Sequence, residues 1–271
     1  MKRLLYRTPL GGRLRPRAAV LLYHRVAEPA SDPHGQAVRP DTFESHLEML
    51  RREYHVAALP DLIGKRYQDR TVAVSFDDGY ADNLTAAAPA AARLGVPITV
   101  FVTVQPVLDG QPFPWDEREE HGRPLTVEEL RRLAALPGVA VGAHTMTHPR
   151  LSSIPLEDQR REMTESRSRL AELTGRPVDL LAYPFGKPGD VGPETPRLAA
   201  EAGYRAAFLS QAGRIVRSSP RYLLPRLSVH DWPAEALAGK LNAVFDPGQD
   251  GKDIKDLNDL KDINDIEVTV L

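Results

Sequence analysis

Two short motifs in this sequence carry side chains that could bind a metal ion and support hydrolysis. The first is Asp77-Asp78-Gly79, and the second holds His144 and His148. Two adjacent carboxylates repel each other, so burying both is costly unless a cation compensates their charge. One carboxylate and two imidazoles around an open position form a ligand set of hydrolytic zinc sites. The second carboxylate is then free to act as a base.

Each motif taken alone has a simpler explanation. Asp-Asp-Gly is common in turns, and two histidines at this spacing often occur by chance. The chain contains no cysteine, which excludes thiolate zinc sites, cysteine nucleophiles and a disulfide framework. Any metal must therefore be bound by His, Asp or Glu, and the two motifs together favour such a site.

Both motifs follow short apolar runs that are typical of buried strands, and five further runs are similar. We expect strands at 18–23, 71–76, 97–103, 139–143, 178–183, 204–209 and 226–229. Helical spacing predicts helices over 43–54, 81–94, 127–136, 156–173 and 194–202, and Thr126 with Glu129 forms a capping-box pattern. This alternation predicts one domain with a parallel sheet, either open or closed into a barrel.

Loops that follow parallel strands converge on one face, so the polar residues after several of these strands should meet. They are His24, Asp77-Asp78, His144 with His148, and Pro184-Phe185-Gly186. Arg226 stands at the start of its strand and fits this placement less well. The segment 109–123, which contains Trp115, is expected to be a long loop beside the site.

The motifs resemble those of a known family. Ser75-Phe76-Asp77-Asp78-Gly79 is similar to the first motif of the polysaccharide deacetylases (carbohydrate esterase family 4, the NodB homology domain), and His144-Thr145-Met146-Thr147-His148-Pro149 to their second. The resemblance extends over about residues 20–229. It implies a distorted (β/α) barrel with fewer than eight strands, here about seven parallel ones. It also implies metal binding by Asp78, His144 and His148, with Asp77 as the general base.

The sequence departs from the family pattern in two places. Ala182 occupies the position of the arginine that opens the third motif, and the usual late catalytic histidine is not evident. Leu22-Tyr23-His24-Arg25-Val26 resembles the early Tyr-His segment of the poly-N-acetylglucosamine deacetylases, which implies His24 as the general acid. Arg226 is the candidate to orient Asp77, and His230 is a rival acid.

The resemblance implies a metal-dependent hydrolase that removes the N-acetyl group from an N-acetylhexosamine of a glycan, glycolipid or sugar precursor through metal-activated water. The backbone N–H of Phe185 would hold the oxyanion, and Tyr183, Phe185 and Trp115 are candidate substrate contacts. Zn²⁺ is the expected metal, with Co²⁺, Ni²⁺ or Mn²⁺ as alternatives. The same site acting on an O-acetyl ester or cyclic amide, or an inactive carbohydrate-binding protein, is the competing interpretation.

Composition and charge define three segments. The chain has 271 residues, a net charge of −2 and 42% hydrophobic residues, which is typical of a soluble globular protein. We expect a basic arm at 1–17, the barrel at 18–245, and an acidic low-complexity tail at 246–271. No apolar run approaches the about 20 residues of a membrane span, and no signal peptide is recognised. These features predict a cytoplasmic protein, with peripheral membrane association through the arm and no nucleic-acid partner.

Overall fold

The computed structural model describes residues 16–64, 66–113, 115 and 122–246. Its centre is a curled parallel sheet in the order β10-β1-β5-β6-β7-β8-β9, with β4 paired to the start of β5. The strands are β1 (Ala18–Tyr23), β4 (His55–Val56), β5 (Thr71–Phe76), β6 (Ile98–Val102), β7 (Val139–Ala143), β8 (Leu180–Ala182), β9 (Ala206–Phe208) and β10 (Leu227–Ser228). Without the short β4, seven strands remain in one continuous order, which confirms the expected distorted (β/α) barrel of about seven parallel strands.

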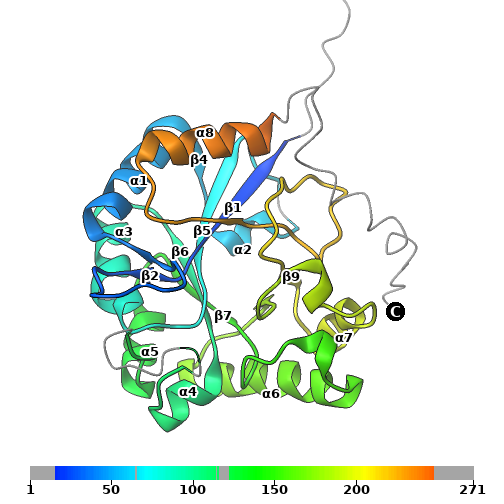
Figure 1. The fold of residues 1–271 in the computed structure, drawn as a ribbon. Coiled ribbons are helices and arrows are strands. Elements are labelled where there is room, and N and C mark those ends of the chain that lie inside the picture. The colour runs from blue at the N-terminus through cyan, green and yellow to red at the C-terminus, as the bar shows by residue number, and fades with distance from the viewer. Residues whose placement is uncertain (1–15, 65, 114, 116–121, 247–271) are drawn as a thin grey trace, which may run out of the picture.

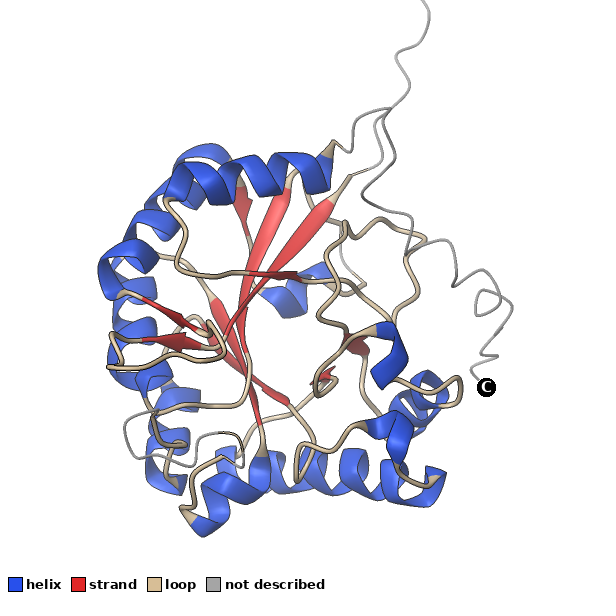
Figure 2. Cartoon of the chain, viewed as in Figure 1, coloured by secondary structure: helices blue, strands red, loops and turns tan. Residues whose placement is uncertain are grey.

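Apart from α2, which lies inside the ring beside the strands, the helices surround the sheet (Figure 1). The helices are α1 (Pro40–Glu53), α2 (Leu59–Leu62), α3 (Ala88–Arg93), α4 (Val104–Asp109), α5 (Val127–Ala135), α6 (Leu156–Thr174), α7 (Thr195–Glu201) and α8 (Ala234–Phe245). Where the sheet opens between β9 and β10, loops rather than helices cover the interior (Figure 2). The predicted helix at 81–94 is divided into a π-helical turn, Asn83–Ala87, and α3.

Alternating side chains of the strands fill two apolar layers. Val72, Val74 and Phe76 face the helices, while Ala73 joins an inner cluster with Phe101 and other residues. This follows from the two-residue period of a strand, which sends successive side chains to opposite faces of the sheet. Parallel strands covered on both faces have nearly continuous apolar sequences, as β1 and β5 do.

Local end signals act as the sequence predicts. Thr126 and Glu129 make both hydrogen bonds of a capping box at the start of α5. Gly175 ends α6 in the left-handed region at φ 65°. Elements additional to the predicted ones are α2, α4, α8, β4 and a small parallel pair of β2 (Arg25–Val26) and β3 (Ala37–Val38).

Most of the predicted basic arm (1–17) and of the predicted acidic tail (246–271) lies outside the described residues. The adjoining residues are attached to the barrel. Arg17 forms an ion pair with Asp69 at 2.7 Å and a second one with Asp246. Within the described part of the chain, none of the helices is long and apolar enough to cross a membrane.

Candidate metal centre and catalytic site

The three predicted metal ligands come together at the carboxyl ends of β5 and β7. Ligand atoms of Asp78, His144 and His148 all lie within 4.8 Å of one another. The Nε2 atoms of His144 and His148 are 3.5 Å and 3.6 Å from Asp78 Oδ1. Asp78 and His144 are each only 2% exposed.

The protonation of the two imidazoles suits metal binding. Nδ1 of His144 lies 2.8 Å from the carbonyl oxygen of Ala182, and a carbonyl can only accept, so Nδ1 carries the proton and the Nε2 lone pair faces Asp78. Burial lowers the pKa of His144, and burial together with His144 lowers the pKa of His148 to about 2. Two neutral imidazoles and a carboxylate fit a divalent ion such as zinc with one position left open.

Unusual backbone conformations concentrate at this site. Five described residues other than glycine have φ in the left-handed region, and four of them belong to it: Asp78 (73°), Thr145 (65°), His148 (61°) and Phe185 (59°). Such conformations cost of order 1 kcal/mol or more each and persist where the surrounding structure enforces them. They turn the chain sharply after each strand, so that neighbouring side chains face one centre.

Asp77 is held by a buried arginine from the far end of the chain. Arg226 Nη1 and Nη2 donate to the two carboxylate oxygens of Asp77 at 2.6 Å and 2.7 Å. Arg226 is 0% exposed and also donates to the carbonyl of Leu209 at 2.9 Å. Burial is the largest influence and raises the pKa of Asp77, but the charge and hydrogen bonds of Arg226, together with His144 and His24, outweigh it, so the pKa is lowered and the group stays ionised.

The register of β10 explains how Arg226 reaches Asp77 from the start of a strand. Leu227 pairs with Leu21, which itself pairs with Val74, so β10 begins halfway along β1 and β5. Arg226 therefore enters the barrel below Asp77, and its extended side chain covers the remaining distance. Arg226 thus reaches the site from the start of its strand, although the other site residues follow the ends of theirs.

His24 follows β1 and lies within electrostatic range of Asp77, His144 and Arg226. Burial lowers its pKa to about 4, against the opposing effect of Asp77. His230 is more exposed, and its Nδ1 lies 2.7 Å from the carbonyl oxygen of Gly35. Asp77 and His148 thus have His24, and not His230, among the groups that influence their pKa values.

The aromatic candidates occupy different positions. The Trp115 ring lies 4.3 Å from that of His148, and its Nε1 donates to the Tyr80 hydroxyl at 3.0 Å. Phe185 is 48% exposed, its ring lies 5.1 Å from that of His148, and its backbone N–H donates to no acceptor among the described residues. Tyr183 is buried, and its hydroxyl donates to the Tyr222 carbonyl at 3.0 Å, so the structure does not bring it to the surface of the site.

The sequence of the chain is similar to a family of known proteins. The profile of the polysaccharide deacetylases matches residues 64–207, which is more than half of the chain. The chain belongs to the polysaccharide deacetylase family. It is also 24% identical over 216 residues to a Bacillus subtilis (strain 168) protein named as a polysaccharide deacetylase, YxkH, covering 78% of this chain and 70% of that protein.

Solved structures of deacetylases share the fold. The Streptococcus pyogenes deacetylase PplD, in complex with acetate, superposes with a TM-score of 0.71 at 19% identity, covering 84% of this chain and 99% of that one. A de-N-acetylase from Aggregatibacter actinomycetemcomitans gives 0.70 at 17% identity, covering 83% and 99%. IcaB from Ammonifex degensii gives 0.67 at 21% identity, covering 84% and 98%.

Three residues of this family member support the site and are absent from the sequence prediction. Asn83 Nδ2 donates to the carbonyl of His24 at 2.9 Å, and Asp82 accepts from the Val26 N–H at 3.1 Å. Glu162 on α6 accepts from the backbone N–H of Met146 at 2.8 Å and of Thr147 at 2.9 Å. Asp82 and Asn83 follow the first motif directly, which is a signal in the sequence, whereas nothing local marks Glu162.

Proposed function

We propose that this member of the family is a metal-dependent N-deacetylase acting on an N-acetylhexosamine of a glycan, glycolipid or sugar precursor. The observation that carries the proposal is that Arg226 binds Asp77 and keeps it ionised. Three other residues beside Asp77 can bind the metal without it. A carbohydrate-binding protein with a structural metal has no need of this carboxylate. The proposal also agrees with the names of the structural relatives, one a de-N-acetylase and one bound to acetate.

Asp78, His144 and His148 would hold the metal, with zinc as the expected ion. When bound, such an ion lowers the pKa of water towards about 7 and polarises a carbonyl oxygen. Asp77 accepts the proton of the attacking water, because Arg226 keeps both carboxylate oxygens ionised and fixed. The backbone N–H of Phe185, which donates to no acceptor among the described residues, would stabilise the oxyanion that forms from the acetyl carbonyl.

His24 is the proposed acid that protonates the departing amine. Without a proton, the leaving nitrogen would depart as a strongly basic anion. Since burial lowers the pKa of His24 to about 4, the residue is neutral at pH 7 in the free protein. We infer that negative charge developing on the substrate raises this pKa in the complex, which allows His24 to carry the proton that it donates.

The test measures the metal content of the purified protein and acetate release from N-acetylglucosamine oligomers before and after chelation. We expect about one ion per chain and acetate release that chelation abolishes and added zinc restores. Asp77→Asn should reduce acetate release by about 100-fold or more while leaving the metal content unchanged. Full activity of Asp77→Asn would refute the assignment of the base.

The alternative substrate for the same site is an O-acetyl ester or a cyclic amide. An alkoxide leaves more readily than an amide nitrogen, so ester cleavage depends less on the acid. The His24→Ala variant separates the two, because it should lose amide hydrolysis and retain more of any ester hydrolysis. Equal losses on matched N-acetyl and O-acetyl substrates would show that His24 does not act as the acid.

A further inference from the structure

A large pocket lies at the end of the barrel opposite to the candidate metal centre. Its volume is about 1360 Å³. Pro16, which lines it, precedes β1, and Ile215, which also lines it, bonds to the backbone of Ala18 at the first residue of that strand. Asp77 follows the last residue of the paired strand β5, so about 20 Å of strand separates the pocket from the site.

The floor of the pocket is apolar and continuous with the barrel interior. Ile63, Ile215 and Leu224 line it, and all three belong to the inner apolar cluster that fills the barrel. They are 5%, 4% and 3% exposed. The pocket therefore offers an apolar surface that the strands do not cover at this end.

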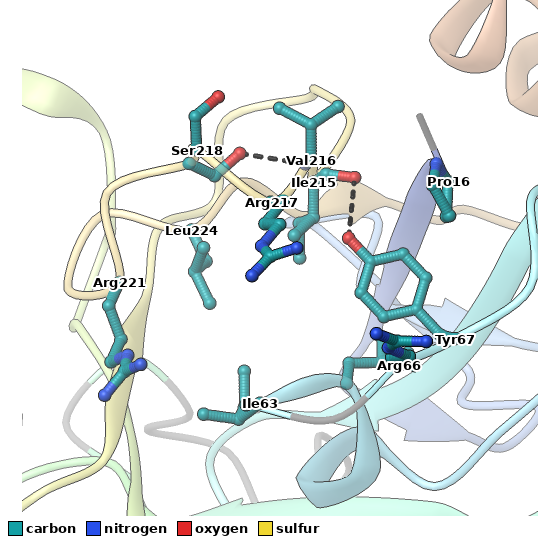
Figure 3. Close-up of a pocket in the computed structure, with 13 residues that line it drawn as sticks. Pro16, Ile63, Arg66, Tyr67, Ile215, Val216, Arg217, Ser218, Arg221 and Leu224 are labelled. Carbon is teal, nitrogen blue, oxygen red and sulfur yellow. Dashed lines mark hydrogen bonds between the residues drawn. The ribbon is translucent and has the colours of Figure 1, made fainter. Parts of the chain in front are cut away.

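Three arginines surround this floor. In Figure 3, Arg221 lies on one side of the opening, Arg66 on the other, and Arg217 between them, with Ile63 below. None of the three forms an ion pair with a carboxylate in the part of the chain that the structure describes, and the described lining residues include no Asp or Glu.

Asp61 lines a neighbouring pocket with Arg66, and other carboxylates near this end of the barrel are bound to other arginines. Arg17 pairs with Asp69 and Asp246, and Arg205, which donates to the carbonyl of Ile63 at 3.0 Å, lies 3.8 Å from Asp179. None of these carboxylates forms an ion pair with Arg66, Arg217 or Arg221 among the described residues. Guanidinium groups bind phosphate and carboxylate oxygens in a planar, two-bond arrangement.

We propose that this pocket binds an anionic amphiphile, a phosphate or carboxylate head joined to an apolar body. The head lies among Arg66, Arg217 and Arg221, and the apolar body covers Ile63 and Leu224. A wholly polar anion would leave the floor exposed to water, and a neutral amphiphile would leave the guanidinium groups unpaired. The same chemistry comes from a free amphiphile or from the headgroup region of an anionic membrane.

The sequence that leads into the pocket lining is basic, whereas the acidic segment begins at Asp246, which pairs with Arg17. Lys2, Arg3, Arg7, Arg13 and Arg15 precede Pro16 in the sequence, and Pro16 itself lines the pocket. Basic residues next to a membrane surface strengthen binding to anionic lipids. An anionic membrane is therefore tested as the origin of the ligand alongside a free amphiphile.

Calorimetric titration of the full chain with octyl phosphate, below its micelle concentration, tests the proposal. Inorganic phosphate and octyl glucoside serve as probes for the head and the apolar body alone. We expect saturable binding of octyl phosphate that is tighter than that of either probe. The R66Q/R217Q/R221Q variant should bind it about tenfold more weakly or worse, with R217Q intermediate. R132Q, which removes an exposed arginine of α5, should bind as the original chain does.

Absence of saturable binding, equal binding by the triple variant, or equal binding of inorganic phosphate or octyl glucoside would overturn the proposal. Co-sedimentation with phosphatidylglycerol vesicles, compared with phosphatidylcholine vesicles, then distinguishes the sources. Binding to the anionic vesicles that the triple variant loses assigns the site to a membrane lipid. Octyl phosphate binding without vesicle binding assigns it to a free amphiphile.

Discussion

Replacing Arg226 by methionine tests the interior of the site without any knowledge of the substrate. Arg226 is 0% exposed and gives Asp77 two hydrogen bonds of 2.6 Å and 2.7 Å. Methionine fills part of the volume but leaves a buried carboxylate without its counter-charge. Removing one partner of a buried pair costs about 3–5 kcal/mol, so R226M should lower the free energy of unfolding by that amount.

The effect should depend on the charge of Asp77. In the R226M/D77N double variant no uncompensated carboxylate remains at that position, so we expect the combined loss to be smaller than the sum of the single losses by about 2–3 kcal/mol. Urea unfolding at pH 7, followed by circular dichroism, measures all three variants.

Arg205→Met is the matched control for R226M. Arg205 lies 3.8 Å from Asp179, and the two side chains are 47% and 35% exposed. Solvent screens such a pair, and Arg205 also donates one hydrogen bond to the Ile63 carbonyl, so its loss should cost at most about 2 kcal/mol. The reasoning is refuted if R226M costs no more than R205M, or if the losses from R226M and D77N are simply additive.

Three further predictions concern a residue that supports the site, a helix cap and a glycine turn. Asn83→Ala removes the hydrogen bond to the His24 carbonyl, so acetate release should fall severalfold while unfolding loses about 1–2 kcal/mol; unchanged kinetics would contradict this positioning role. Glu129 has its pKa lowered to about 2 by hydrogen bonds with its arginine partner, so its ionised form contributes stability above its ordinary pKa near 4.5. Glu129→Gln should therefore cost about 0.5–1 kcal/mol at pH 7, and the difference should shrink as pH falls from 4.5 towards 2, as urea unfolding at several pH values measures. Gly186→Ala should cost about 2 kcal/mol or more, because φ is 68° and the new Cβ would lie 2.7 Å from a backbone nitrogen, whereas Gly189→Ala meets nothing and should be nearly neutral in the same assay.

Much of the sheet was predictable because each strand is a compact apolar run that ends at a polar motif. β1, β5 and β7 begin and end at the predicted residues. The convergence of Asp78, His144 and His148 followed from one rule, since parallel strands bring their carboxyl ends to the same edge. The local sequence shows both the apolar strands and the polar motifs that follow them.

The contact between Arg226 and Asp77 was only a candidate in the sequence prediction, because it depends on the register between distant strands. Where β10 begins along β1 is decided by packing across the whole sheet, and no local pattern encodes it. The helix α8 is a different case, since Leu237, Leu241 and Phe245 recur every four residues and are all buried. That spacing is a helical signal which the sequence prediction did not use.

The two adjacent carboxylates show why the assignment of roles needs three dimensions. Asp77 continues the alternation of β5 and shares the inner face with Ala73, where Arg226 meets it. Continued as a strand, the chain would send Asp78 outwards with Phe76, among the helices. Its left-handed φ of 73° ends the strand there and directs the carboxylate towards His144 and His148 instead. One carboxylate is thus matched to a guanidinium and the other to two neutral imidazoles, so their surroundings, and not their identical chemistry, separate the proposed base from the proposed metal ligand.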